Sequence, residues 1–124
     1  MLRSRLSNTP WFTILTAEQQ QRVIDETLLQ EHPSGAFIVR KGDPSRHWIG
    51  VIDGLVRISV GTADGKLASL TGVPPGGWVG EGALLKHETR RYDLVTLRDS
   101  MIAKMPIDTF FWLLDNSIAF NRFL

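Results

Sequence analysis

The residues with the clearest capacity for chemistry lie between positions 80 and 95. A glycine-punctuated turn opens a short run of small and apolar residues, Gly80-Glu81-Gly82-Ala83, and Arg90-Arg91 follows about ten residues later. Backbone N–H groups at the start of a helix attract a phosphate, and an arginine clamps it as a fork. Glu81 can accept hydrogen bonds from a sugar. This combination predicts a pocket for an anion that also carries hydroxyl groups.

Other chemistries find little support in the sequence. The three histidines, His32, His47 and His87, are far apart and lack carboxylates at metal-ligand spacing, so a metal site of the cupin type is not favoured. His87 is expected to be a solvated loop residue. The chain has no cysteine and therefore no disulfide or thiolate site. No nucleophile elbow or comparable Ser/His/Asp arrangement is present, and we expect no enzymatic activity.

Size and charge set the broad class of protein. The 124 residues are 43% hydrophobic, enough for one domain with its own core over residues 1–124. The formal net charge is +1, with Lys and Arg scattered along the chain, which does not resemble a nucleic-acid footprint. No apolar run approaches the length of a membrane span, and the basic N-terminus lacks the apolar stretch of a signal peptide. We expect a cytoplasmic protein with no membrane association.

The elements that must position residues 80–95 are mostly strands. Short apolar runs separated by turn residues recur from about Leu28 to Met105, a spacing that predicts an antiparallel barrel or jelly roll. The runs cover residues 36–39, 48–52, 55–60, 67–70, 94–97 and 101–103. Asp53-Gly54 and Asp64-Gly65 have the composition of tight hairpin turns that need a positive φ.

Helices are predicted on both sides of this region. Thr16 and Gln19 have the spacing of a capping box that starts a helix. After Pro106, residues 107–115 carry a helical apolar pattern, and a further helix of about residues 117–124 follows. Phe120, Phe123 and Leu124 give that last helix an apolar face. The face suggests a domain from a longer protein, or a helix that pairs with a second subunit.

The segment from Gly80 to Val95 resembles the phosphate-binding cassette of cyclic nucleotide-binding domains, the sensor modules of the Crp/Fnr family of regulators. The resemblance extends from about Phe12 to Leu124. It is carried, besides the cassette, by Ile14–Gln19, Gly35–Pro44, Trp48–Ser59 around Gly54, and Met105-Pro106 followed by Phe110, Leu113, Leu114 and Asn116.

The resemblance implies a mainly β fold, a double-stranded β-helix or jelly-roll barrel with flanking N- and C-terminal helices. It implies an effector-sensing regulatory domain whose last helix begins a dimerisation helix, and therefore a homodimer. The effector it implies is a cyclic nucleotide, cAMP or cGMP. In the family, DNA is bound by a following helix-turn-helix domain, which this chain does not contain.

The resemblance also assigns roles to individual residues. In the family, the glutamate after the cassette glycine binds the ribose 2′-hydroxyl, cassette amides hold the cyclic phosphate, and a later arginine pairs with it. These roles fall on Glu81 after Gly80, on the amides around Gly82 and Ala83, and on Arg91. Arg90 is the alternative for the last role, but Arg91 places the following apolar residues in the family's positions.

Three residues depart from the family pattern. Gly82 stands where the family has a large aliphatic residue, and Tyr92 is bulky where a second phosphate contact would lie. Asp93 replaces an alanine, and its carboxylate would disfavour a nearby anion unless it turns away or pairs with Arg90. Two alternatives therefore stay open: a dimerisation scaffold of the same fold that binds no nucleotide, and a small metal-dependent cupin enzyme. Arg90 and Arg91 could also be exposed residues that face Glu88, Asp93 or Asp99.

Overall fold

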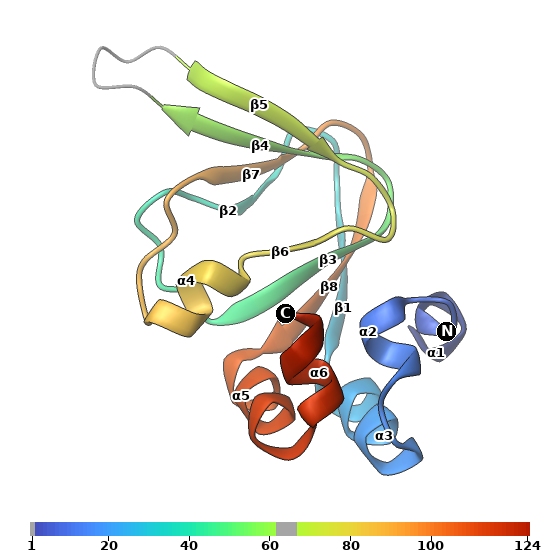
Figure 1. Cartoon of the computed structure of the whole chain (residues 1–124). Helices are drawn as coiled ribbons and strands as arrows, with labels where there is room; N and C mark the ends of the chain where they lie inside the picture. Colours follow the sequence, from blue (N-terminus) through green and yellow to red (C-terminus); the bar gives the residue numbers. More distant parts are fainter. Residues whose placement is uncertain (1, 62–66) are drawn as a thin grey trace.

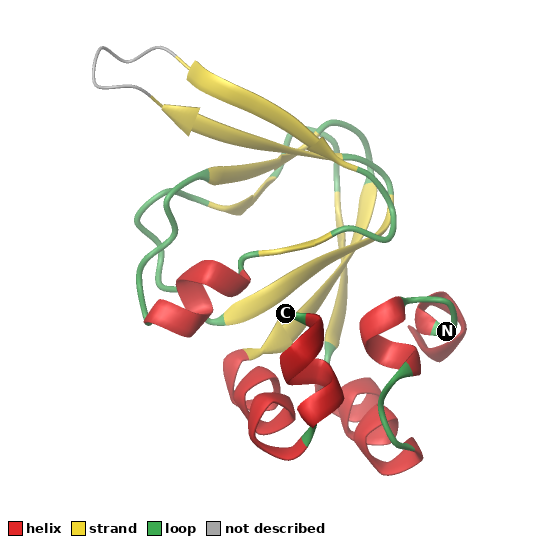
Figure 2. Cartoon of the chain, viewed as in Figure 1, coloured by secondary structure: helices red, strands yellow, loops and turns green. Residues whose placement is uncertain are grey.

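The structure is a computed structural model that describes residues 2–61 and 67–124, and strands form its centre (Figures 1 and 2). The strands are β1 (Leu28–His32), β2 (Phe37–Val39), β3 (His47–Asp53), β4 (Val56–Gly61), β5 (Leu67–Val73), β6 (Trp78–Val79), β7 (Asp93–Thr96) and β8 (Ser100–Pro106). The helices are α1 (Leu2–Leu6), α2 (Pro10–Thr13), α3 (Ala17–Glu26), α4 (Glu81–Lys86), α5 (Ile107–Asn116) and α6 (Ile118–Phe123).

The strands form two antiparallel sheets of four strands each. One sheet has the order β1-β8-β3-β6 and the other the order β2-β7-β4-β5. The sheets face each other (Figure 1). Helix α4 lies at one end of the sheets, and the remaining helices lie beside the first sheet. The predicted mainly β jelly roll with flanking helices is confirmed.

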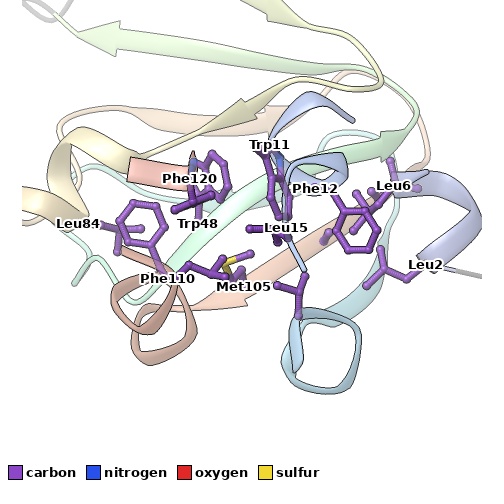
Figure 3. Close-up of a cluster of buried hydrophobic side chains, with 14 residues drawn as sticks. Leu2, Leu6, Trp11, Phe12, Leu15, Trp48, Leu84, Met105, Phe110 and Phe120 are labelled. Carbon is purple, nitrogen blue, oxygen red and sulfur yellow. The ribbon is translucent and has the colours of Figure 1, made fainter. Parts of the chain in front are cut away.

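Alternation along β3 and β8 separates two hydrophobic cores, because successive strand residues face opposite sides of a sheet. Ile49, Val51 and Ile102 belong to the core between the sheets. Trp48 and Met105 belong to a second core, between the first sheet and the helices (Figure 3). Strands β3 and β8 of the first sheet are thus buried on both faces.

Aromatic side chains connect the helices to the first sheet. Trp11 of α2 contacts Trp48 of β3 and Trp78 of β6, with ring centroids 5.1 and 5.0 Å apart. Phe110 of α5 and Phe120 of α6 both pack on Trp48, at 5.5 and 5.7 Å. These five rings, called the aromatic cluster below, join both ends of the chain to one strand.

Phe120 corrects one expectation about the last helix. Its side chain is fully buried in the aromatic cluster, whereas Ile118, Phe123 and Leu124 are 74%, 47% and 41% exposed. The prediction that Phe120, Phe123 and Leu124 form one exposed apolar face is therefore wrong for Phe120. The helical period of α6 turns Phe120 toward Trp48 and leaves Ile118 on the exposed side.

The turn at Asp53-Gly54 also differs from its prediction. Gly54 has the expected positive φ of 102°, but β3 and β4 belong to different sheets and do not pair. The residue forms a corner between the sheets, where an added Cβ would lie 2.2 Å from Ser100 Oγ. Asp64-Gly65 lies outside the described residues, although the flanking β4 and β5 do pair antiparallel.

The two remaining differences concern the N-terminal region. The capping box is confirmed, since Thr16 Oγ1 accepts from Gln19 N–H and the Gln19 side chain accepts from Thr16 N–H. The chain before it also forms α1 and α2, and β1 begins at Leu28. The sequence showed no alternation over β1 because this strand is an edge strand whose Leu28 is exposed.

Candidate functional site

The cassette begins at a backbone position that only glycine occupies without strain. Gly80 precedes α4 with a φ of 100°, in the left-handed region that disfavours residues with a Cβ. A Cβ there would also lie 2.3 Å from Nη1 of Arg90. The turn therefore requires glycine both for its conformation and for the close approach of the arginine.

Arg90 is an internal clamp. Its side chain is 3% exposed, Nη2 donates to the carbonyl oxygen of His47, and Nη1 donates to that of Gly80 at 3.4 Å. Burial lowers the pKa of the Arg90 guanidinium from its ordinary value, while Tyr92 and Asp43 act in the opposite direction. Arg90 thus ties the cassette turn to the start of β3 rather than facing the cassette cavity.

Glu81 connects the cassette to the aromatic cluster. Its Oε2 accepts a hydrogen bond of 3.1 Å from the indole Nε1 of Trp48, a side chain that is only 2% exposed. A carboxylate has about four lone-pair sites, so this bond leaves capacity for a further donor. Leu84 of α4 is fully buried and lies beside Phe110 in the same core (Figure 3).

A cavity of about 390 Å³ opens beside α4 and falls within the range of small-molecule sites. We call it the cassette cavity; its lining residues are Ile58, Val79, Gly80, Glu81, Gly82, Ala83, Lys86, Glu88, Arg91 and Tyr92. The lining includes all six residues that the sequence favoured as ligand-binding, and it does not include the alternative, Arg90. The six are Gly80, Glu81, Gly82, Ala83, Arg91 and Tyr92.

Lys86 and Glu88 also line the cavity but were not singled out from the sequence. Lys86 is the last residue of α4 and Glu88 lies in the loop that follows, and their charge alone did not distinguish them from solvated residues. Formal charges in the cavity are balanced, with Glu81 and Glu88 opposite Lys86 and Arg91.

Arg91 forms an ion pair inside this lining. Its Nη2 lies 2.7 Å from Oε2 of Glu88, and the arginine side chain is 71% exposed. An exposed pair of this kind contributes little stability, about 0–1 kcal/mol. Arg91 can therefore exchange Glu88 for another anion at small cost.

Tyr92 forms part of the apolar wall of the cavity. The half-buried ring packs against the core between the sheets. Burial raises the pKa of its phenol, Glu81 raises it further, and Arg90 partly opposes the shift. The hydroxyl is therefore neutral at physiological pH and can donate a hydrogen bond.

Asp93 is turned away from the cavity. Its Oδ1 accepts a hydrogen bond of 2.8 Å from the backbone N–H of Lys41. The carboxylate thereby fixes the loop before β3, and it pairs with neither arginine. Of the two arrangements expected from the sequence, the structure has the one in which Asp93 turns away.

His87 was predicted to be a solvated loop residue, and the prediction is incomplete. The residue is exposed, but its ring stacks on Phe111 of α5, with centroids 5.3 Å apart and planes 10° apart. His87 has a φ of 54° as it ends α4, and this conformation directs the chain back toward the arginines.

Two further findings concern the described residues only. No group of three or more His, Cys, Asp or Glu side chains there is arranged to hold a metal ion. None of the helices in residues 2–61 and 67–124 is long and apolar enough to span a bilayer.

The model of a family described as "Cyclic nucleotide-binding domain" matches residues 29–117. This match includes all eight strands but the first residue of β1, the whole cassette, and α5. It therefore covers well over half of the chain. No curated protein sequence matches the chain.

Solved structures superpose on nearly the whole chain. The sensor domain of the transcriptional regulator DNR from Pseudomonas aeruginosa does so with a TM-score of 0.89 at 17% identity, covering 97% of this chain and 81% of that one. The catabolite activator protein of Thermus thermophilus gives 0.79 at 22% identity, covering 91% of this chain and 53% of that one.

A third structure is a regulatory subunit of a cAMP-independent protein kinase A from Trypanosoma cruzi, bound to guanosine. It gives a TM-score of 0.83 at 20% identity and covers 95% of this chain but 41% of the subunit. The chain thus spans less than two thirds of the length of these last two proteins. At such identities the superpositions establish a shared fold, and the family match establishes membership: the chain belongs to the cyclic nucleotide-binding domain family and resembles the sensor domains of Crp/Fnr regulators.

Proposed function

We propose that the chain is the effector-sensing domain of a Crp/Fnr-type transcription regulator and that its effector binds in the cassette cavity. The observation that carries the proposal is the convergence of Glu81, Arg91 and the open backbone at Gly82 on one cavity. The chemistry offered is a carboxylate for hydroxyl groups, cations for a phosphate, and an apolar wall for a base. A regulator of this kind acts in the cytoplasm and needs no catalytic activity.

The proposed binding mode follows from the existing contacts. The Glu81 oxygens left by Trp48 accept from a ribose hydroxyl. Arg91 leaves Glu88 and pairs with the cyclic phosphate as a fork, with Lys86 as a second cation. Because α4 has only six residues, side-chain cations rather than a helix dipole supply most of the attraction.

Glu88 makes this proposal sharply testable, because it competes with a phosphate for Arg91. Isothermal titration calorimetry should compare cAMP, cGMP and guanosine, a nucleoside without phosphate. For a cyclic nucleotide, Arg91→Gln should weaken binding about tenfold or more, the value of one charge-assisted hydrogen bond. Glu88→Gln should strengthen it, and Arg5→Gln on exposed α1 serves as a control.

The same titrations separate the alternatives. If no nucleotide binds wild-type or Glu88→Gln protein, the sensing proposal fails. The scaffold that binds no nucleotide is then favoured, and the Arg91–Glu88 pair and the packed Tyr92 ring support that reading. Binding of guanosine that neither variant changes would indicate that the protein takes a nucleoside without using Arg91 for a phosphate. Stoichiometric transition metal in the purified protein would instead indicate the cupin enzyme.

We further propose a homodimer that uses α6. Ile118 and Phe123 expose 74% and 47% of their surfaces on this helix, and a DNA-binding helix-turn-helix domain would follow it in a full regulator. Sedimentation velocity should show a wild-type dimer that Ile118→Asp dissociates. A monomeric wild type, or a dimer unaffected by Ile118→Asp and Phe123→Asp together, would contradict this arrangement.

A further inference from the structure

A second cavity, of about 270 Å³, lies on the other side of Arg90 from the cassette. We call it the basic cavity; it is lined by Ile38, Val39, Asp43, Pro44, Arg46, His47, Ile49, Arg90 and Lys104. Its volume is below the usual range for drug-sized ligands but equals that of about nine water molecules. A small, compact ligand fits this size.

Strand pairing brings the cations of this cavity together. Lys104 of β8 lies directly opposite Ile49 of β3 in the antiparallel register, and directly opposite residues point to the same face of a sheet. His47, two residues before Ile49, therefore points to that face as well. Arg46 adjoins His47, and Arg90 reaches the carbonyl of His47 from the cassette side.

Positive charge in the basic cavity is poorly compensated. Asp43 is its only acidic lining residue, and none of the salt bridges among the described residues involves Arg46, Arg90 or Lys104. Arg90 is nine-tenths buried or more, and its Nε has no hydrogen-bond partner within the described part of the chain. A buried guanidinium without a paired anion is costly, so an anion beside it would be stabilising.

The unused donors also favour an anion. Lys104 Nζ donates to Gln30 Oε1 at 2.7 Å, which leaves two of its three N–H groups. Burial lowers the pKa of both Lys104 and His47, and the neighbouring cations Lys104, Arg90 and Arg46 lower that of His47 further. The part of the His47 shift that comes from these cations is the response expected of a histidine among positive charges without a counter-ion.

We propose that the basic cavity is an anion site, distinct from the cassette cavity, that takes a phosphate-sized oxyanion through Arg46, His47 and Lys104, next to buried Arg90. The anion can be free inorganic phosphate or the phosphate group of a small ester. The site does not depend on nucleotide binding in the cassette.

Binding of inorganic phosphate should be measured by calorimetry and by NMR of the His47 ring at neutral pH, with chloride at equal ionic strength as the reference. Arg46→Gln and Lys104→Met should each weaken phosphate binding about tenfold or more. Arg5→Gln on α1 is the matched control for a lost surface charge. Because Arg46 is exposed, its substitution tests the site without endangering the fold.

Sulfate allows a pH test, because it stays dianionic where phosphate titrates. An anion beside His47 favours the imidazolium, so sulfate should bind more tightly as pH falls through the lowered pKa of this histidine. The charged groups that line the basic cavity with His47 are Arg46, Arg90, Lys104 and Asp43; of these four, only Asp43 carries a carboxylate. Glycerol 3-phosphate in place of inorganic phosphate distinguishes an esterified from a free anion by its affinity.

Three results would overturn the proposal. One is a His47 signal that responds no more to phosphate than to chloride. Another is equal phosphate affinity in wild type, Arg46→Gln and Lys104→Met. The third is loss of phosphate binding in Arg91→Gln, which would place the anion in the cassette cavity instead.

Discussion

Gly80 and Gly82 lie two residues apart in the cassette, but they differ in backbone conformation and in the space around them. Gly80 has a positive φ and lies against Arg90. Gly82 lies inside α4, and apart from its chain neighbours and the helix's own backbone no atom comes within 4 Å of the position that its Cβ would occupy. The departure of Gly82 from the family pattern therefore leaves open space rather than a structural requirement.

These two glycines give a matched pair of substitutions. Gly80→Ala should lower the free energy of unfolding by about 1–3 kcal/mol, because it strains the backbone and displaces the Arg90 guanidinium. Gly82→Ala should raise it by up to about 1 kcal/mol, since alanine is the better helix former. Urea denaturation followed by circular dichroism measures both. Equal effects of the two substitutions would contradict the clamp between Gly80 and Arg90.

At the scale of elements, α4 and His87, the residue that ends it, are held by contacts to two other elements, β3 and α5. Glu81 accepts from Trp48 of β3, His87 stacks on Phe111 of α5, and Leu84 is buried beside Phe110. A helix of six residues is marginal by itself, so these tertiary contacts fix its position. A ligand that moves Glu81 or Arg91 would act on α4, and through it on α5 and α6, which supports a sensing role.

The hydrogen bond between Glu81 and Trp48 can be tested by the choice of substituent. Glu81→Ala leaves the buried indole N–H of Trp48 without an acceptor and should lower the free energy of unfolding by about 1–3 kcal/mol. Glu81→Gln keeps an acceptor oxygen and should cost much less. Near-ultraviolet circular dichroism should show the altered tryptophan environment only in Glu81→Ala. Similar losses in both variants would show that the charge, rather than the hydrogen bond, matters.

At the scale of the whole molecule, the first sheet is covered on one face by the second sheet and on the other by the helices. Both cavities form at the end of the molecule where β3 begins and the cassette lies. Arg90 separates them and donates to the backbone on either side. Burial lowers the pKa values of His32, His47 and Lys104, and neighbouring cations lower those of the two histidines further.

These shifts predict how stability depends on pH. The pKa values of His32 and His47 are lowered in the folded chain. In the unfolded chain both histidines have the ordinary pKa of about 6.5. The unfolded chain therefore takes up more protons as pH falls below that value, and stability decreases toward the lowered folded pKa values. The urea midpoint should be lower at pH 5.5 than at pH 7.5. His32→Gln together with His47→Gln should flatten this dependence; an unchanged slope would contradict it.

Local sequence signals predicted much of the fold. Apolar runs between turn residues located six of the eight described strands, and the capping box located α3. These features depend on neighbours in the chain, where spacing determines which groups can meet. The resemblance of residues 80–95 to the family's cassette selected six of the ten residues that line the cassette cavity.

Only the tertiary structure decided which side chains line the cassette cavity and which are buried within the fold. Arg90 and Arg91 are adjacent and chemically identical, yet one is buried against two carbonyls and the other lines the cassette cavity. Distant partners likewise decide the other features: Asp93 and Lys41 are 52 residues apart, Glu81 and Trp48 are 33 apart, and Arg46 and Lys104 of the basic cavity are 58 apart. No local pattern contains that information, because the burial and pairing of a polar side chain are set by the distant strands packed around it.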